Sequence, residues 1–500
     1  MITARPQKNL KTAKEYFRKH LSQGDYYSEG QSVAGRWFGQ GIARLGLDAS
    51  SPVTEAAFIR LCDNQHPATG ERLTVRQRQQ ERRVFYDFAV SAPKSVSVLA
   101  LTVGDPRLVN AHEEAARAAF SRVERVASTR VGKGGSHADR HTGEVLAAEF
   151  RHDTSRALDP QLHSHFVVFN GTWDPVESRW KALQTSKMFD QMAFFTEVYR
   201  SELALRVRTL GYGIRNTANG FEIDGVPQDI LDRFSKRRRD ILAAEPQAVT
   251  ELNARRQREL DHAVQESQTP EARAAAEQAR RNFVPRTALT NTGRSHLAHA
   301  TRPRKSDHLK AEEVLAYQRG QLTPEEFAAL RRLVSPEEAP RHASLIPAFN
   351  LARAILPASA RISTIGSAEA IDYARDHLFE RRSVVPRCHL LTEAMVYTRG
   401  FVTLLELEAD LARRQEFIAV DEMLTTAGTL RQEQRLLKLV NQGVGRVRPL
   451  NAAFVGDAKL TPEQRLALRH ILCSPDLVLG IAWRSWNGQV HPAAGSCARH

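Results

Sequence analysis

The sequence predicts an α+β protein, and two kinds of segment carry this prediction. Short apolar runs at 84–90, 144–152 and 163–170 have the length and composition of buried strands. Longer stretches at 108–127 and 185–211 carry charged residues between apolar ones at helical spacing. Strands and helices alternate over the first part of the chain, and a mostly helical remainder follows from about residue 228.

The first predicted element is a short helix in a basic N-terminal segment. Thr12 and Glu15 have the spacing of a capping box, so we expect this helix to begin at Thr12. After the strand 84–90, Pro93 marks the start of another helix. The strands 144–152 and 163–170 flank a polar loop and can therefore pair antiparallel.

Composition narrows the class of protein. The 500 residues suffice for two or three domains, and 42% hydrophobic with 26% charged residues is typical of a soluble protein. We expect a cytoplasmic protein, because no apolar run is long enough for a membrane span and the N-terminus has no apolar signal core. The four cysteines form no CxxC pair, and the net charge of +14 favours a polyanionic partner such as nucleic acid.

Three histidines form the candidate metal site. His163 and His165 are separated by one residue in a predicted strand, so their side chains leave the same face. His152 ends the preceding strand and comes beside them if the two strands pair. Three imidazoles would bind a metal and leave positions open for substrate oxygens. The alternative is that these histidines are hydrogen-bonded members of the strands.

Asp87 and Tyr16 are the other candidates for chemistry. Asp87 interrupts an apolar strand, where it would either orient a metal-binding imidazole or form a salt bridge with an arginine. Tyr16 lies on the first helix, where most aromatic residues are packing anchors. A phenol has a pKa of about 10, so it needs a nearby cation or base to act as a nucleophile.

These segments together resemble the TrwC/TraI-like (MobF-type) conjugative relaxases of the HUH endonuclease group. The resemblance covers about residues 16–215 and rests on SAPKSVS (91–97), DPQLHSH (159–165), GRWFGQGIARLGL (35–47) and TLGYGIR (209–215). It implies the HUH relaxase fold, in which helices flank a central antiparallel sheet. The activity implied is nicking and rejoining of one DNA strand at a transfer origin through a 5′-phosphotyrosine intermediate.

The resemblance also assigns roles to individual residues. Tyr16 becomes the nucleophile, His152, His163 and His165 hold the metal, and Asp87 supports the site. Relatives often carry two Tyr-Tyr pairs, whereas here Phe17 follows Tyr16. A second cleavage would therefore fall to either Tyr26 or Tyr27.

The later segments AIDYARDHLFERRSVV (370–385) and KLTPEQRLALRHIL (459–472) resemble the beginning of a RecD-like helicase. Family members continue into a phosphate-binding loop that ends in Gly-Lys-Ser or Gly-Lys-Thr, and this chain contains neither triplet. We therefore expect a truncated motor and no ATP use. The predicted domains are a relaxase (1–295), a helix-rich helicase-like part (296–455), the start of a motor (456–482) and an aberrant tail (483–500).

Cofactor and partners follow from the same reasoning. Three nitrogen ligands suit Mn, Zn, Ni or Cu, while cellular abundance favours Mg or Mn. The expected partners are single-stranded DNA and an origin hairpin, together with relaxosome accessory proteins and the coupling protein of a bacterial type IV secretion system. Six basic residues are candidates for phosphate contacts: Lys8, Lys11, Lys14, Arg18, Lys19 and Lys94.

Three other functions are compatible with the same residues. A rolling-circle replication initiator or transposase would use the same tyrosine chemistry. A three-histidine metallohydrolase would use activated water and form no covalent intermediate. In a non-catalytic DNA-binding protein the histidines would be purely structural, and neither EDTA nor the substitution Tyr16→Phe would change its behaviour toward DNA.

Overall fold

The computed structural model describes residues 1–18, 35–75, 83–132, 138–301, 310–334, 366–456 and 460–480. The chain divides into two compact units. The first comprises Met1–Ala374 with Cys388–Leu411, and the second comprises Arg375–Arg387 with Ala412–His500. These units do not follow the boundaries expected at 295 and 455, which stay predictions about domains.

The first unit is built on a five-stranded antiparallel sheet. Its order is β1 (Ile2–Gln7), β3 (Phe85–Ser91), β7 (Pro160–Phe169), β6 (Ala147–Thr154) and β2 (Arg36–Phe38). The predicted central antiparallel sheet is therefore confirmed, with strand ends shifted by a few residues. The edge strand β1 was not expected, because its sequence ITARPQ is mostly polar and contains a proline.

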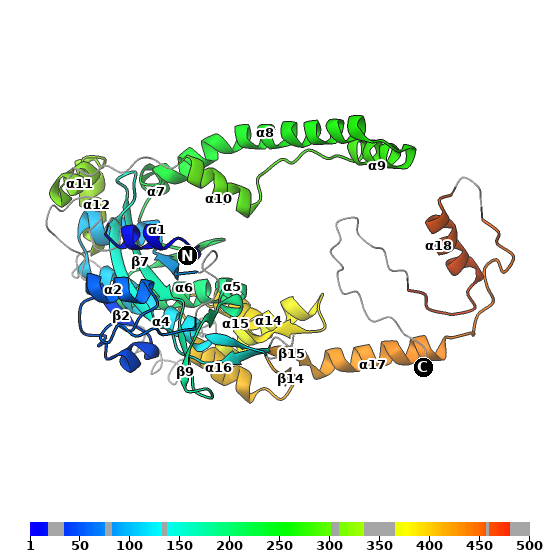
Figure 1. Cartoon of the computed structure of the whole chain (residues 1–500), viewed down its shortest axis with the longest axis horizontal. Coiled ribbons are helices and arrows are strands. Elements are labelled where there is room, and N and C mark those ends of the chain that lie inside the picture. The colour runs from blue at the N-terminus through cyan, green and yellow to red at the C-terminus, as the bar shows by residue number, and fades with distance from the viewer. Residues whose placement is uncertain are drawn as a thin grey trace, which may run out of the picture. The chain divides into compact units, whose positions relative to one another are not determined.

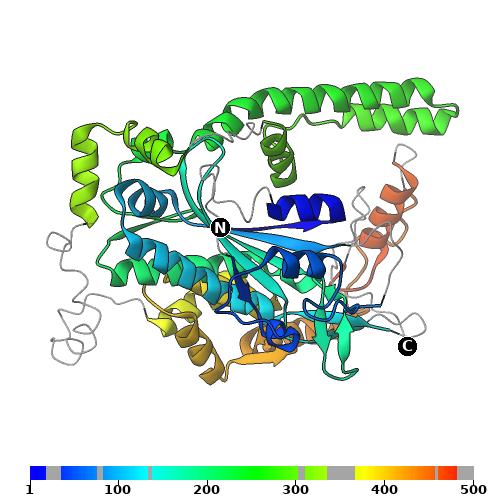
Figure 2. The same cartoon turned by 60° about the vertical axis from the view of Figure 1, so that its left-hand side comes forward.

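Helices cover both faces of this sheet (Figures 1 and 2). On one face, α1 (Leu10–Tyr16) and α2 (Glu55–Cys62) pack with the strands around an aromatic core that includes Phe17, Phe58 and Phe150. On the other face, the ring of Phe120 from α4 (Pro106–Arg125) stacks on Phe166 of β7 at 4.1 Å. Helix α6 (Met192–Thr209) packs against α4.

Two helix boundaries differ from the sequence-based expectation for identifiable reasons. Helix α1 begins at Leu10 and not at Thr12, because the side chain of Asn9 accepts a hydrogen bond of 3.0 Å from the Thr12 amide. The single helix expected at 185–211 is interrupted at Gln191 and forms α5 (Ser186–Asp190) and α6. The earlier start of α1 leaves Tyr16 as the last residue of the helix.

Short strands and single turns connect these layers. Three minor sheets are formed by β10-β4-β5, β8-β9 and β11-β12. The remaining elements up to β12 are η2 (Gln40–Leu45), α3 (Lys94–Ser97), η4 (Val98–Val103), β4 (Ser128–Val131), β5 (Ala138–His141), β8 (Thr172–Asp174), β9 (Arg179–Lys181), β10 (Leu183–Gln184), β11 (Ile214–Thr217) and β12 (Gly220–Ile223).

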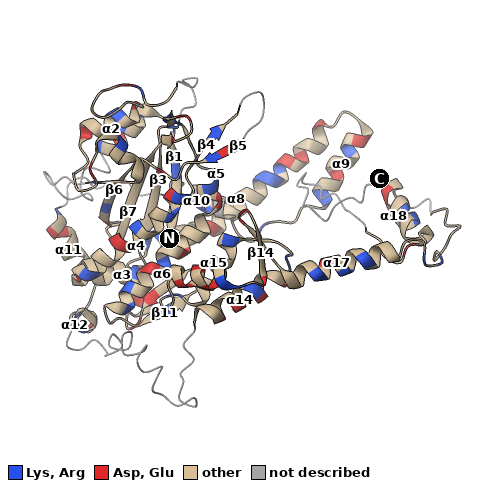
Figure 3. Ribbon diagram, turned by 90° about the horizontal axis from the view of Figure 1, so that it is seen from below, with Lys and Arg blue, Asp and Glu red and all other residues tan. Residues whose placement is uncertain are grey.

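A long helical arm follows the sheet. Helix α8 (Lys236–Glu266) pairs with α9 (Pro270–Arg281), and the two extend side by side away from the sheet (Figures 1 and 2). Figure 3 shows that basic and acidic residues are mixed along α8. The remaining helices are α7 (Gln228–Arg233), α10 (Asn291–Ala300), α11 (Ala311–Arg319), α12 (Pro324–Val334), α14 (Ser367–Phe379), α15 (Arg387–Tyr397) and α16 (Leu404–Arg413).

In the described part of the second unit, a small antiparallel sheet is formed by β13 (Val385–Pro386), β15 (Met423–Thr426) and β14 (Phe417–Val420), and two whole helices accompany it. They are α17 (Ala427–Gln442) and α18 (Pro462–Cys473). The predicted helix-rich C-terminal region is confirmed. Within the described ranges, no helix combines the length and apolarity needed to span a membrane.

Candidate active site

A hydrogen-bonded chain joins the first helix to the centre of the sheet. The Tyr16 hydroxyl donates to Oδ2 of Asp87 at 2.7 Å, and Nδ1 of His165 donates to Oδ1 of the same carboxylate at 2.7 Å. Asp87 lies opposite Val167 in the β3–β7 register, so His165 is its diagonal neighbour on one face. The strand carboxylate therefore accepts a hydrogen bond from both the phenol and an imidazole.

The three predicted metal-binding histidines lie together on this face. His152 of β6 is directly opposite His163 of β7, as expected from antiparallel pairing of the two strands. The ring centroids are 5.4 Å apart for His152 and His163, and 5.2 Å apart for each of the other two pairs. Nδ1 of His163 donates to the carbonyl of Gln161 at 2.8 Å.

These distances can be compared with a bound metal. Three imidazoles that bind one ion tetrahedrally at about 2.1 Å have ring centroids about 5.3 Å apart. The spacing and the donor type thus fit a three-nitrogen site, in which Nε2 of His163 and His165 would face the ion. Among the described residues, no three His, Cys, Asp or Glu side chains are arranged so that they could hold an ion as they stand.

Asp87 stays ionised in this setting. Burial by itself would raise the pKa of Asp87, but the attraction of His165 and the hydrogen bonds from His165 and Tyr16 lower it overall. An ionised carboxylate at this position fixes the orientation of one imidazole ring and one phenol.

The basic residues expected to contact phosphate have different surroundings. Lys8 and Lys11 are exposed, whereas Lys14 pairs with Asp63 at 2.8 Å and Arg18 with Glu55 at 2.6 Å. Lys94 donates to the carbonyl of Pro160 at 2.9 Å, and burial lowers its pKa to about 8. The other predicted residues, Lys19, Tyr26 and Tyr27, lie outside the described residues.

The sequence reasoning missed a second network on the opposite face of β7. His112 of α4 is fully buried, with Nδ1 at 2.7 Å from the Tyr199 hydroxyl and Nε2 at 3.1 Å from Oγ of Ser164. Ser164 is the residue between His163 and His165, so alternation along the strand turns it away from the metal site. The one signal in the sequence was Ser164 itself: a polar residue between the two histidines, on the buried face of the strand, needs a hydrogen-bond partner.

Comparisons with known proteins agree with this geometry. The TrwC relaxase family model matches residues 10–324. The multifunctional conjugation protein TraI of Escherichia coli is 38% identical over 240 residues, which are 45% of this chain and 13% of that protein. The TraI protein of Escherichia coli strain K12 is 35% identical over 240 residues, with the same coverage. The match thus spans about an eighth of the length of these relatives.

A solved structure supports the fold. The chain is similar to conjugative relaxase TrwC in a copper-bound complex with oriT DNA, at a TM-score of 0.50 and 24% identity. The similarity covers 66% of this chain and 99% of the other. The family model extends over more than half of the residues, from α1 to α12. The chain therefore belongs to the TrwC relaxase family.

Proposed function

We propose that this chain is a conjugative relaxase, an enzyme that nicks and rejoins one DNA strand at a transfer origin. Membership of the TrwC relaxase family supports this reaction class. The single observation that carries the proposal is the 2.7 Å hydrogen bond between the Tyr16 hydroxyl and Asp87, next to three clustered imidazoles. A tyrosine that only fills space in the core would need neither the Asp87 carboxylate nor the three imidazoles beside it.

In the proposed reaction, the Tyr16 oxygen attacks the scissile phosphorus in line. A new bond forms between the tyrosine oxygen and phosphorus, and the bond to the 3′-oxygen breaks. The leaving oxygen takes up a proton to become a 3′-hydroxyl, and the 5′ end stays linked to Tyr16. Because one phosphodiester replaces another, the step is nearly balanced in energy and attack by a 3′-hydroxyl reseals the strand.

The structure suggests how Asp87 contributes. Complete proton transfer from a phenol with a pKa of about 10 to a carboxylate with a pKa of about 4 is uphill by about 8 kcal/mol. The lowered pKa of Asp87 makes the carboxylate a still weaker base. We therefore assign Asp87 the task of aiming the Tyr16 oxygen and holding the His165 ring, with the proton passing to solvent.

His152, His163 and His165 would hold a divalent metal. A cation there supplies charge neutralisation for the non-bridging phosphate oxygens. Mg and Mn are favoured by abundance, and the similar TrwC structure is described as copper-bound, so Cu, Zn and Ni are alternatives. The proposal includes Tyr26 or Tyr27 for a second cleavage. It includes no ATPase, since the sequence lacks a Gly-Lys-Ser or Gly-Lys-Thr triplet.

The proposed partners are those of a conjugative relaxase. They are single-stranded DNA with an origin hairpin, relaxosome accessory proteins and the coupling protein of a secretion system. The TrwC relaxase to which this chain is similar was solved with oriT DNA. We place the reaction in the bacterial cytoplasm, where donor DNA is processed.

The test is formation of a covalent protein–DNA adduct. The protein is incubated with a labelled single strand that carries its cognate origin, plus Mn or Mg, and the products are separated under denaturing conditions. We expect a slow, protease-sensitive DNA species from the unaltered chain and none from Tyr16→Phe. Tyr86→Phe is the matched control, because Tyr86 is adjacent to Asp87 but leaves the other face of β3.

Three outcomes would contradict the proposal. If the strand is cleaved without forming an adduct, and Tyr16→Phe still cleaves it, the protein is a metallohydrolase. DNA binding unaffected by EDTA and by Tyr16→Phe, with no cleavage of any strand, would leave a purely structural role for the histidines. If the cognate DNA sequence acts only as a replication origin or a transposon end, the same tyrosine chemistry serves rolling-circle replication or transposition and not conjugation.

A further inference from the structure

A groove of about 630 Å³ lies at the end of the sheet next to the start of β3. Its described lining residues come from the junction of β1 and α1, the segment after α2, strand β4 and the segment from Arg179 to Ala182, together with Val84 and Asn170. The residues that matter for its charge are Lys8, Asp63, Arg72, Arg130, Arg179 and Lys181. Five of these six side chains are cationic.

Three of the cations have no acidic partner within the described part of the chain. Lys8, Arg72 and Arg130 are exposed, and no ion pair is formed by any of them there. Arg179 and Lys181, by contrast, both pair with Glu177, at 2.6 and 2.8 Å. Asp63, the one acidic side chain among the described lining residues, is neutralised by Lys14 at 2.8 Å. The groove therefore has an excess of uncompensated positive charge.

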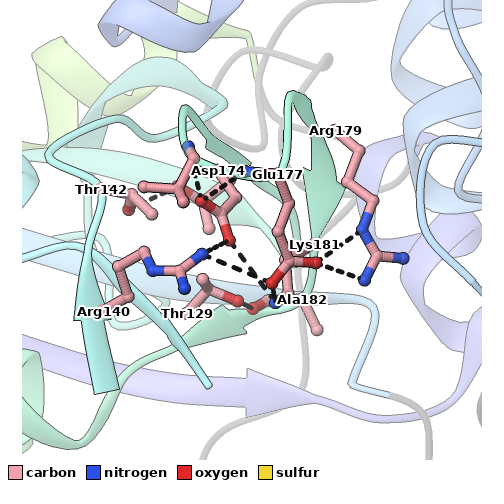
Figure 4. Close-up of polar contacts among 10 residues, drawn as sticks. Thr129, Arg140, Thr142, Asp174, Glu177, Arg179, Lys181 and Ala182 are labelled. Atoms are coloured by element: carbon pink, nitrogen blue, oxygen red, sulfur yellow. Dashed lines mark hydrogen bonds and ion pairs between the residues drawn. The ribbon is translucent and has the colours of Figure 1, made fainter. Parts of the chain in front are cut away.

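The wall formed by β8 and β9 is held in place by polar contacts (Figure 4). Asp174 accepts a hydrogen bond of 2.7 Å from Arg140 of β5 and one of 3.0 Å from the Val176 amide. Thr129 of β4 donates to the Ala182 carbonyl at 2.9 Å. Acidic residues on this wall are thus occupied by their own neighbours, and the groove is preformed.

The groove is close to the candidate active site along two elements. Val84 lines it and precedes Asp87 by three residues of β3, which is about 10 Å along a strand. Leu10 also lines it and precedes Tyr16 by six residues of α1, which is about 9 Å along a helix. A strand bound at the active site would have its next few phosphates at this distance.

We propose that this groove binds the sugar–phosphate backbone of DNA next to the scissile phosphate, through Lys8, Arg72 and Arg130. The proposal rests on the proposed relaxase function, and it locates the DNA backbone beside the scissile phosphate in this groove. Side-chain amides in the groove are engaged within the protein, since Asn64 donates to the Thr74 carbonyl and Asn170 to the Arg83 carbonyl. Contacts from cations to phosphates position a strand and carry no sequence information by themselves.

The experiment compares two triple variants by the salt dependence of DNA affinity. Lys8→Ala, Arg72→Ala and Arg130→Ala are combined in one. The control combines Arg255→Ala, Arg256→Ala and Arg273→Ala, which remove the same charge from the arm, where each arginine pairs with a glutamate. Binding of a labelled origin strand is measured by fluorescence anisotropy between about 50 and 200 mM salt.

For the groove variant we expect affinity to fall by about 10- to 100-fold at about 0.1 M salt. The slope of log affinity against log salt should decrease by about 0.7 for each lost contact with a single strand. Each single substitution should remove about one third of that change. The arm variant should keep both the affinity and the slope within about twofold of the unaltered chain.

Two DNA probes identify the source of the phosphates. The first probe is a linear strand that ends where the hairpin begins; the groove variant binds it more weakly if single-stranded backbone occupies the groove. The second probe includes the folded hairpin; the loss of affinity is larger with it if the duplex stem also contacts the groove. Equal slopes for the groove and arm variants with both probes would overturn the proposal. Adduct formation tests the relaxase function separately from the groove: the unaltered chain and the arm variant should form the adduct, and Tyr16→Phe should not.

Discussion

The two faces of strand β7 carry the same residue types in opposite surroundings. On one face, His165 and Tyr16 both hydrogen-bond to the ionised Asp87, and each of these side chains is partly exposed. On the other face, His112 and Tyr199 are fully buried and hydrogen-bonded to each other. Burial lowers the pKa of His112 to about 3 and raises that of Tyr199.

The difference lies in the surroundings and not in the residue types, and it is what separates the tyrosine–histidine pair that we propose to be reactive from the buried pair. A neutral histidine without access to solvent can only hold its neighbours in position. A histidine next to a carboxylate at an open face can bind a cation and meet a substrate. Four substitutions or conditions test this contrast, in order of decreasing effect.

The largest contrast is expected between His165→Ala and His112→Ala. Loss of a metal ligand should reduce the rate of adduct formation by about 100-fold or more, with little loss of stability. Loss of His112 should destabilise the fold by about 2 to 4 kcal/mol and leave the rate in the folded fraction within a few-fold. Denaturant unfolding and adduct kinetics on each variant measure the two quantities, and the reverse pattern would refute the assignment of the faces.

Asp87→Asn should have the next largest effect. The amide keeps the shape of the carboxylate but loses the charge that holds His165 and Tyr16. We expect metal affinity and the adduct rate each to fall by about 10- to 100-fold. Calorimetric titration with Mn checks the first effect. If the metal binds as tightly as before, Asp87 does not act through His165.

Acidification should destabilise the protein through His112. The folded-state pKa of His112 is about 3, below the ordinary value of 6.5. The unfolded chain therefore binds a proton that the folded chain excludes, and stability falls as the pH drops below 6.5 toward 3. The contribution approaches about 1.4 kcal/mol per pH unit well below pH 6.5.

Unfolding free energies between pH 7 and pH 5 measure this effect, with His112→Gln as the comparison. The variant should lose less stability than the unaltered chain over this interval. An identical pH dependence in both proteins would show that other groups control acid stability.

Ser164→Ala should have the smallest effect, although its neighbours are two of the candidate metal ligands. The serine hydroxyl contacts His112 on the buried face. Its loss leaves one imidazole nitrogen without that hydrogen bond and should cost about 1 to 2 kcal/mol of stability. Adduct formation should stay within about threefold. A loss of activity as large as that of His165→Ala would show that the two faces are coupled.

The positions of the three histidines could be predicted because strand geometry is local. Alternation along one strand places His163 and His165 on the same face, and antiparallel pairing across a short loop brings His152 beside them. Both steps involve residues close together in the chain, and the structure agrees with them. The strand character of the segment with Asp87 followed from its apolar neighbours in the same way.

Other features of the site depended on contacts that local patterns do not encode. Tyr16 meets Asp87 across 71 residues of sequence, and His112 meets Tyr199 across 87. The start of α1 was also misplaced, because Asn9 competed successfully with Thr12 as the cap. The sequence by itself determined which residues are candidates for binding a metal or attacking a phosphate. The tertiary structure alone decided which tyrosine and which histidine share an open face, because packing of distant elements sets burial, and burial sets charge and reactivity.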